Sequence, residues 1–199
     1  MTTLIVTAHP DTDSLTHRAA QRLHELLEPD ASRHGTVRLA HLAQEGFDPR
    51  FTAADRQTYL TRSAPDPAVA VEQRRFEGVD HVVLVFPVYW WSMPALLKGW
   101  IDRVFIAGWA FDFDDDDRLV PLLGRLTAHL LPISGTSPDA FARHGYLESL
   151  TTQIGHGVID YCGMRRGTTA FVYDSESGSR NEAAAAVESA VGEVAAAIG

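Results

Sequence analysis

Residues 82–105 read VVLVFPVYWWSMPALLKGWIDRVF, and this stretch decides which fold the sequence predicts. Val82 to Phe86 form an apolar run of the kind that makes a strand buried on both faces. Pro87 should end that strand, because proline cannot donate a hydrogen bond to a central ladder. A helix should start near Pro94, since proline costs little in a first helical turn. The helix would bury one apolar stripe, which consists of Leu96, Leu97, Trp100, Ile101, Val104 and Phe105.

The same unit of strand followed by helix recurs on both sides of this stretch. The expected strands are residues 4–8, 36–42, 82–86, 126–133 and 168–173. The first expected helix is capped by Ser14 and runs to about Leu27. A short helix is expected near 53–59, and further helices over residues 67–76, from Pro94 onward and over residues 181–198. Residues 139–161 should form helical segments that break near Gly155 and Gly157. Such alternation predicts an α/β fold, with a doubly wound parallel sheet of five strands in the order 2-1-3-4-5 and helices on both faces.

Composition limits the classes of partner. The chain has 199 residues, of which 45% are hydrophobic and 22% charged, and no stretch resembles an interdomain linker. We therefore expect one domain over residues 1–199. The formal net charge of −9 disfavours a nucleic-acid partner, because a negative protein repels phosphate backbones. A ligand that carries phosphate would have to be held locally, by backbone N–H groups at a helix end.

The cysteine and histidine content limits the disulfides and metal sites that the chain can form. The apolar runs bear on secretion and membrane insertion. Cys162 is the only cysteine, so neither a disulfide within the chain nor a cysteine metal cluster can form. The nine histidines show no H-E-x-x-H or similar spacing, and we predict no metal site. The first residues resemble a strand rather than a signal peptide, and no apolar run approaches the roughly 20 residues that span a bilayer. We expect a cytoplasmic protein without stable membrane insertion.

In a sheet of this order, ligands bind beyond the carboxyl ends of the first and third strands. The first of these loops reads AHPDTDSLT, from Ala8 to Thr16. The N–H groups at the start of the following helix, the hydroxyls of Ser14 and Thr16, and the imidazole of His9 can together form an anion pocket. The loop has no glycine, so it is neither a dinucleotide fingerprint nor a P-loop. The alternative is that Ser14 only caps the helix and His9 is a surface residue.

The loop after the third strand carries three consecutive aromatic residues, Tyr89, Trp90 and Trp91. Residues at this place should face solvent or a ligand rather than the core. Flat rings and exposed backbone amides suit an isoalloxazine ring system, whose faces need stacking and whose polar edge needs N–H donors. The alternative is that Trp90 or Trp91 fills a dimer interface.

The loop after the fourth strand contains Ser134, Gly135 and Thr136, whose small side chains let a ring approach the backbone closely. By itself this loop is equally consistent with a plain turn. His144 lies in the segment that follows and is a candidate proton donor, with a surface histidine as the alternative.

Four blocks of sequence resemble one known family. They are Ala8-His9-Pro10 with Ser14, GFDP at residues 46–49, FPVYWWSMPALLKGWIDRV at residues 86–104, and GWAF at residues 108–111. Together they are similar to the flavodoxin-like NAD(P)H:quinone oxidoreductases, a family that includes the DT-diaphorases, the bacterial modulators of drug activity and the ancillary oxidoreductases of potassium-efflux systems. The resemblance runs from about residue 4 to about residue 173, and its block from Pro87 to Phe111 is long and specific.

The resemblance implies a flavodoxin-like fold, a tightly bound FAD or FMN, and a homodimer with the active site at the subunit interface. Carried over, it assigns the flavin phosphate region to His9, Ser14 and Thr16, the isoalloxazine border to Pro87, Val88, Tyr89, Trp90 and Trp91, and the other edge of the ring to Ser134, Gly135 and Thr136. Many relatives have Thr-Thr-Gly-Gly here, followed by a tyrosine and a histidine that contact the reacting rings. This chain has Phe141 near the tyrosine position, so Tyr146 and His144 become the candidate catalytic proton donors.

The implied reaction is a two-electron transfer, by hydride, from NAD(P)H through the flavin to a quinone or similar acceptor. One stacking site shared by both substrates predicts ping-pong kinetics. The expected cofactor is FAD, with FMN as the alternative, and the choice between NADH and NADPH stays open. Three other interpretations remain: a flavodoxin-type one-electron carrier, a regulatory flavoprotein subunit of an ion-efflux system, and a flavin-free interaction domain.

Overall fold

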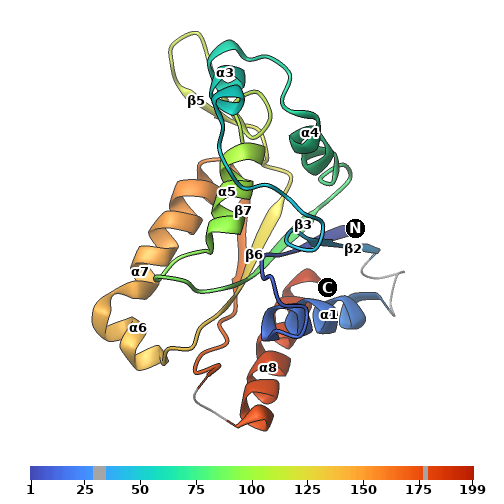
Figure 1. Ribbon diagram of the computed structural model, residues 1–199, viewed down its shortest axis with the longest axis vertical. Helices are drawn as coiled ribbons and strands as arrows, with labels where there is room; N and C mark the ends of the chain where they lie inside the picture. The colour runs from blue at the N-terminus through green and yellow to red at the C-terminus, as the bar shows by residue number, and fades with distance from the viewer. Residues whose placement is uncertain (29–34, 177–178) are drawn as a thin grey trace.

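A parallel sheet forms the centre of the computed structural model, which describes residues 1–28, 35–176 and 179–199 (Figure 1). Its five strands are β1 (Thr2–Thr7), β2 (Thr36–His41), β3 (His81–Pro87), β6 (Thr127–Ile133) and β7 (Arg165–Thr169). They lie in the order β2-β1-β3-β6-β7, and every neighbouring pair is parallel. Counted along the chain, this is the predicted order 2-1-3-4-5, so the doubly wound α/β fold is confirmed.

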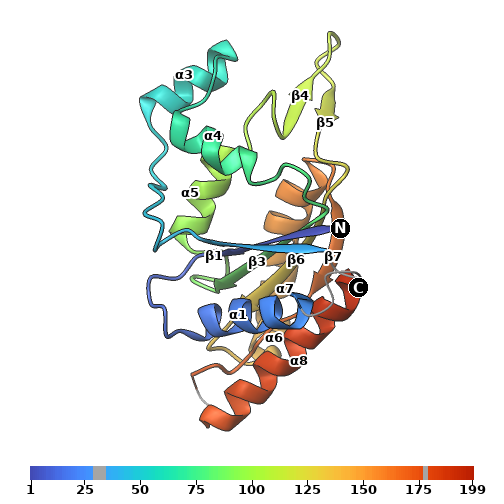
Figure 2. The same cartoon turned by 90° about the vertical axis from the view of Figure 1, so that its right-hand side faces the viewer.

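Helices cover both faces of the sheet. One face carries α1 (Leu15–Leu27) and α8 (Arg180–Ile198), and the other carries α4 (Pro67–Arg74), α5 (Ala95–Val104) and the helical segment that follows β6. Figure 2 shows α1 and α8 side by side, and their contact buries Leu23 and Val191 completely. Trp100 of the predicted α5 stripe is also completely buried. These two apolar layers hold the strand ends, and hence the loops, in place.

The helical segment after β6 breaks at Gly145, so the predicted break near Gly155 and Gly157 is wrong. The segment consists of α6 (Pro138–His144), α7 (Tyr146–Leu150) and the π-helix η2 (Thr151–Asp160). Gly145 has a φ of 69°, a left-handed value that glycine adopts without steric penalty, and it therefore ends α6. Gly155 lies inside η2, where a Cβ would come within 3.1 Å of the Arg166 guanidinium carbon. Its role is close packing rather than helix termination.

The fifth strand, β7 (Arg165–Thr169), lies earlier in the chain than the predicted 168–173. His129 of β6 interrupts the ladder, because its Nδ1 accepts the N–H of Thr168 at 3.0 Å in place of a backbone partner, and pairing resumes beyond it at Ala170 and Val172. The register between β6 and β7 shifts beside this residue. Gly167 leaves room for the imidazole, since a Cβ there would lie 2.5 Å from His129 Nδ1.

The sequence pattern does not predict the small antiparallel hairpin of β4 (Phe111–Phe113) and β5 (Leu119–Pro121). Strands of three residues show too little alternation to be recognised. The aspartates at 114–117 lie exposed in the turn of this hairpin, as expected for a solvated loop.

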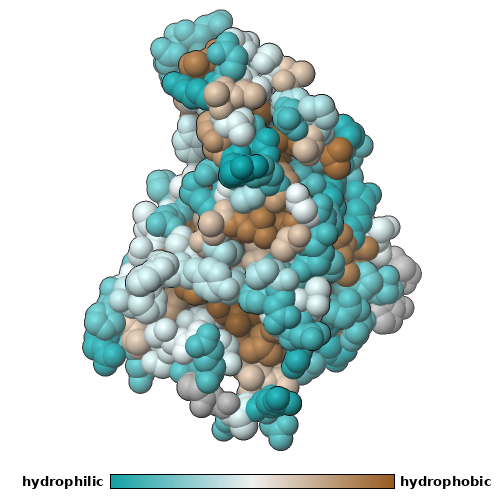
Figure 3. All heavy atoms as spheres, in the orientation of Figure 1, coloured by the Kyte–Doolittle hydropathy of each residue, from teal (hydrophilic) through white to brown (hydrophobic). Residues whose placement is uncertain are grey.

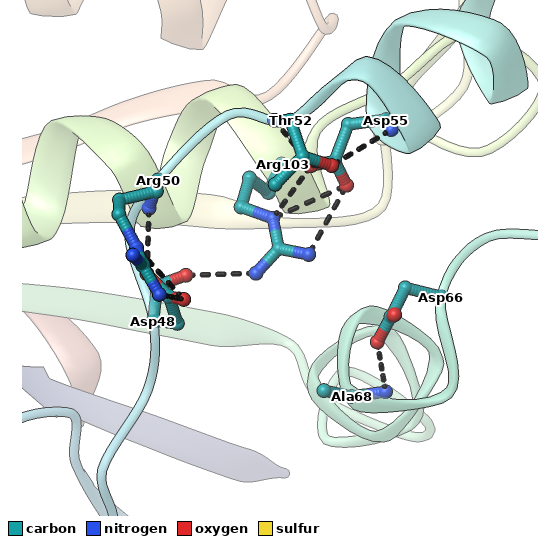
Figure 4. A network of polar contacts seen from close by, with 7 residues as sticks. All are labelled: Asp48, Arg50, Thr52, Asp55, Asp66, Ala68 and Arg103. Carbon is teal, nitrogen blue, oxygen red and sulfur yellow. Dashed lines mark hydrogen bonds and ion pairs between the residues drawn. The ribbon is translucent and has the colours of Figure 1, made fainter.

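A buried ion pair fastens the GFDP block to α5 (Figure 4). Arg103 of α5 lies 3.1 Å from Asp55 and donates to the carbonyl of Asp48 at 2.7 Å. Asp55 also belongs to the capping box that starts α3 (Ala53–Thr61), in which Thr52 is the N-cap. The GFDP block of the family resemblance therefore serves the fold rather than the chemistry.

Candidate functional site

The loops after β1, β3 and β6 meet at one edge of the sheet, because these strands are parallel neighbours. Ala8 begins the first loop, and its N–H donates to the Val85 carbonyl at 3.3 Å. Val88 begins the second loop, and its N–H donates to the Ile133 carbonyl at 2.8 Å. The structure thus brings together the strand ends that carry the three predicted groups of site residues.

The first loop turns into α1 through Ser14, whose Oγ accepts the N–H of His17 at 3.3 Å and caps the helix. His9 is partly exposed, and its Nδ1 accepts the N–H of Asp11 at 3.0 Å. Thr16 is buried, so its side chain does not face the surface of the loop. The first-turn N–H groups of α1 have no acceptor within the helix, and the helix dipole adds positive potential there. The helix end by itself therefore favours an anion, whereas the carboxylates of Asp11 and Asp13 in the same loop oppose one.

The second loop is a tight turn with two tryptophans at its centre. Tyr89 and Ser92 exchange backbone hydrogen bonds of 3.0 and 3.1 Å. Trp90 and Trp91 have left-handed φ values of 48° and 63°. In such a turn these positions are normally occupied by asparagine or glycine. Left-handed backbone costs about 1–3 kcal/mol for other residues, and such strain is typical of functional sites. Trp90 is 91% exposed at the tip of the turn.

Trp91 connects this turn to the helical segment after β6. Its indole stacks on Tyr146, with ring centroids 3.7 Å apart and planes inclined by 8°. The rings of His144 and Tyr146 lie 5.3 Å apart, so the two candidate proton donors are neighbours. Phe141 is buried and meets the Trp91 ring edge-on at 6.0 Å. One aromatic cluster therefore joins the second loop to both candidate donors.

The third loop is closed by hydrogen bonds of its own. Ser134 is buried, and its Oγ accepts the N–H of Thr136 at 3.0 Å. Gly135 is exposed, and a Cβ on it would lie 3.0 Å from the carboxyl carbon of Glu176. The sequence does not single out Glu176, because it lies 41 positions after Gly135 and belongs to no recognisable motif. Gly135 leaves room for that carboxylate beside the loop.

Two hollows border these loops. One of about 550 Å³ adjoins the first loop and is lined by Thr12, His17, Arg18, Gln21, Arg22, Glu25, His41 and Gln44. The other, a groove of about 750 Å³, runs between α3, α5 and η2, and its apolar lining includes Phe51, Tyr59, Ile101, Phe105, Phe111 and Tyr161. Ser92 of the second loop hydrogen-bonds Gln153 on the wall of this groove. Figure 3 shows apolar residues at the surface in the middle of the face that carries α5.

Three observations on the described residues concern metal ligands, membrane helices and the thiol. Among those residues, no group of three or more His, Cys, Asp or Glu side chains is placed to hold a metal ion. Within residues 1–28, 35–176 and 179–199, no helix is long and apolar enough to cross a membrane. Burial raises the pKa of the Cys162 thiol to about 11, which keeps it protonated at neutral pH.

Comparisons with known proteins agree on the fold. A family model described as flavodoxin-like fold matches residues 1–197. Ribosyldihydronicotinamide dehydrogenase (quinone) from Pongo abelii is 29% identical over 183 residues, covering 81% of this chain and 77% of that protein. The NAD(P)H:quinone oxidoreductase from Methanothermobacter marburgensis superposes with a TM-score of 0.84 at 20% identity, over 96% of this chain and 95% of that one. An FMN-dependent NADH-azoreductase from Bacillus anthracis, solved in complex with FMN, gives a TM-score of 0.72 at 18% identity, over 99% of this chain and 97% of that one.

The sheet order, the three loops at its carboxyl edge and these matches define an oxidoreductase on a flavodoxin-like fold. The chain belongs to the family of the flavodoxin-like fold, and the family resemblance seen in the sequence is confirmed.

Proposed function

We propose that this protein is a flavin-dependent NAD(P)H oxidoreductase that passes two electrons to a quinone or similar acceptor. The observation that carries the proposal is the meeting of an anion-attracting helix end with a strained aromatic turn at one edge of the sheet. A flavin nucleotide needs both, since it joins a phosphate to a flat heterocycle. The names of the relatives support the acceptor class, and the FMN bound to the azoreductase supports the cofactor class.

Three sets of residues would hold the flavin. They are His9, Ser14 and Thr16 at the phosphate, Pro87, Val88, Tyr89, Trp90 and Trp91 along the ring system, and Ser134, Gly135 and Thr136 at its other edge. Thr16 would contribute its N–H, because its side chain is buried. The strain in the second loop favours this fit, since aromatic side chains replace the asparagine and glycine that the turn prefers. When bound, the flavin supplies the hydride chemistry, and the protein supplies position and charge.

Tyr146 and His144 are the proposed proton donors. A phenol or an imidazole beside the second loop can deliver the proton that a quinone takes up together with a hydride. Tyr146 is already held there by its stack on Trp91. Phe141 has no hydroxyl and is buried, so it cannot replace the tyrosine that relatives carry near this position.

FAD is the flavin in this proposal. The hollow beside the first loop has a volume of about 550 Å³, which leaves room for groups beyond a single phosphate. Arg18 lines it and offers a positive charge to a second phosphate, whereas Arg22 on the same wall is paired with Glu188. Release of FMN from the purified protein would correct this part of the proposal and leave the rest intact.

We also propose that residues 1–199 form one domain and that two copies form a homodimer with the active sites at the interface. Three large apolar side chains are exposed on the groove between α3, α5 and η2, namely Phe51, Tyr59 and Tyr161. Others are exposed on α3 and on the β4–β5 hairpin and the residue after it, namely Leu60, Phe113, Val120 and Leu122. Exposed apolar surface of this extent is typical of protein contacts. Trp90, at the tip of the second loop, would be buried by the same association. Sedimentation of the purified protein tests the dimer.

Mass spectrometry of the cofactor released from purified protein tests the proposed function. FAD is the expected result, and a colourless protein that releases no flavin would contradict the proposal.

Steady-state rates with NAD(P)H and a quinone both varied should give parallel double-reciprocal lines, whereas intersecting lines would exclude ping-pong order. A one-electron reduced form that persists during dithionite titration would instead indicate an electron carrier. Stable co-purification with a membrane transporter would indicate a regulatory subunit.

A further inference from the structure

We propose that Gln44 and His17 are positioning residues of the first loop, which turn its carbonyl groups away from the phosphate and leave its N–H groups facing it. This inference rests on the proposed function, because it assigns a task to the loop that would bind the flavin phosphate. Neither residue belongs to the motifs that mark the site in the sequence.

Three hydrogen bonds bind two carbonyl groups of the loop. The Gln44 side-chain amide donates to the carbonyl of His9 at 3.3 Å and to that of Pro10 at 3.1 Å. His17 Nε2 lies 3.2 Å from the same His9 carbonyl. A carbonyl only accepts hydrogen bonds, so this ring nitrogen must carry the proton. Two consecutive carbonyls of the loop are therefore bound by donors that come from different elements.

Both donors are themselves held in place. His17 is on α1, is 8% exposed, and its ring lies 4.8 Å from that of His41. His41 ends β2, and its Nδ1 lies 2.7 Å from the hydroxyl of Thr7 at the end of β1. Gln44 lies in the turn after β2, where the N–H of Glu45 donates to the His41 carbonyl at 2.9 Å. The strand ends of β1 and β2 thus fix the direction from which the loop carbonyls are bound.

The physical need for such donors follows from the composition of the loop. A phosphate is repelled by carbonyl oxygens and by carboxylates, and the loop carries Asp11 and Asp13. Pro10 has no N–H, and no glycine eases a reorientation of the backbone. The N–H of Asp13 is already bonded to the Asp11 carboxylate at 2.9 Å. With few N–H groups left, the direction in which the carbonyls point decides whether the loop accepts an anion.

Gln44→Met tests the inference, because it keeps the size of the side chain and removes its N–H donors. The full-length apoprotein is titrated with FMN and with riboflavin, which lacks the phosphate, while flavin fluorescence reports binding. For Gln44→Met we expect the dissociation constant of FMN to rise about tenfold, the loss of one to two hydrogen bonds near a charge, with that of riboflavin changed less than about twofold. His17→Phe, which keeps a ring against His41, should act in the same direction. Gln21→Met is the matched control, since Gln21 lines the same hollow and bonds Glu25 rather than the loop.

The two ligands distinguish failure of this inference from failure of the proposed function. A wild-type protein that binds neither flavin would overturn the proposed function and this inference together. A wild-type protein that prefers FMN, with the same preference in Gln44→Met and in His17→Phe, would overturn the inference alone. Equal weakening of FMN and riboflavin would also overturn it, because it would indicate general damage to the fold. Thermal unfolding of each variant identifies such damage directly.

Discussion

The two edges of the central sheet differ in how their polar groups are satisfied. At the amino edge, His81 Nδ1 and His129 Nε2 lie 3.0 Å apart, and Arg125 donates to the carbonyls of Val79 and Phe76 at 2.6 and 3.0 Å. At the carboxyl edge, two consecutive tryptophans have left-handed backbone, and the first turn of α1 has N–H groups without helical acceptors. The amino edge satisfies most of its polar groups, with the buried hydroxyl of Thr3 as an exception, whereas the carboxyl edge retains strained backbone and the first-turn donors of α1.

This difference separates stability from binding. We expect the strained turn and the unpaired donors at the carboxyl edge to lower stability and to serve the binding of a ligand. Substitutions at the amino edge should therefore reduce the free energy of unfolding, and substitutions at the carboxyl edge should change activity more than stability.

The largest loss in the free energy of unfolding is expected when the buried ion pair of Arg103 and Asp55 is broken. This pair lies outside the candidate site and therefore shows how large an effect on stability alone can be. Asp55→Ala leaves a buried guanidinium without its partner and should lower the free energy of unfolding by about 3–5 kcal/mol, measured by urea denaturation. Asp102→Ala is the control, because it breaks an exposed pair with Lys98 and should cost no more than about 0.5 kcal/mol. Equal costs for the two variants would show that burial does not set the strength of the pair.

Acid should weaken the amino edge next most strongly. Burial, with a smaller contribution from His81, lowers the pKa of His129 from 6.5 to about 4. His129 binds a proton near pH 6.5 in the unfolded chain but only near pH 4 in the folded protein. The contribution of the neutral His129 to the free energy of unfolding is therefore complete above pH 6.5 and is lost as the pH falls toward 4. The loss should be roughly 3 kcal/mol in denaturation experiments across that interval. In His129→Gln the slope over the same interval should become flatter, and an unchanged slope would assign the acid sensitivity to other groups.

At the carboxyl edge, Tyr146→Phe removes a hydroxyl and keeps the ring that stacks on Trp91. The turnover number with a quinone should fall about tenfold, equivalent to about 1.4 kcal/mol in the barrier, with the free energy of unfolding nearly unchanged. His144→Asn, assayed in parallel, shows which of the two groups delivers the proton. Wild-type turnover in both variants would remove both from the proposed role.

The smallest effect is expected for Trp90→Asn. Asparagine tolerates the left-handed backbone of the turn, and Trp90 is 91% exposed, so the substitution should raise the free energy of unfolding by about 0.5–1 kcal/mol. Flavin affinity should fall in the same variant. Reduced stability would mean that Trp90 makes contacts, such as those of a dimer, that outweigh the strain.

Short-range patterns in the sequence were enough for most of the fold. The apolar run in residues 82–86 predicted β3, and the position of Ser14 predicted the start of α1, because an apolar run and a capping hydroxyl are both visible in adjacent residues. The predicted break near Gly155 failed for a long-range reason, since that glycine makes room for the Arg166 side chain. The regular part of β7 ends at Thr169, before the predicted residue 173, for a similar reason, because a histidine on the neighbouring strand replaces a backbone acceptor.

The candidate site divides in the same way. The sequence by itself determined which loops lie at the carboxyl edge, since alternating strands and helices form a parallel sheet whose strand ends share one edge. Only the tertiary structure decided that Trp91 stacks on Tyr146, that Glu176 lies beside Gly135, and that Gln44 binds a carbonyl 35 residues away. Periodicity reports which face of an element is buried, but contacts between distant side chains depend on how complete elements pack against one another.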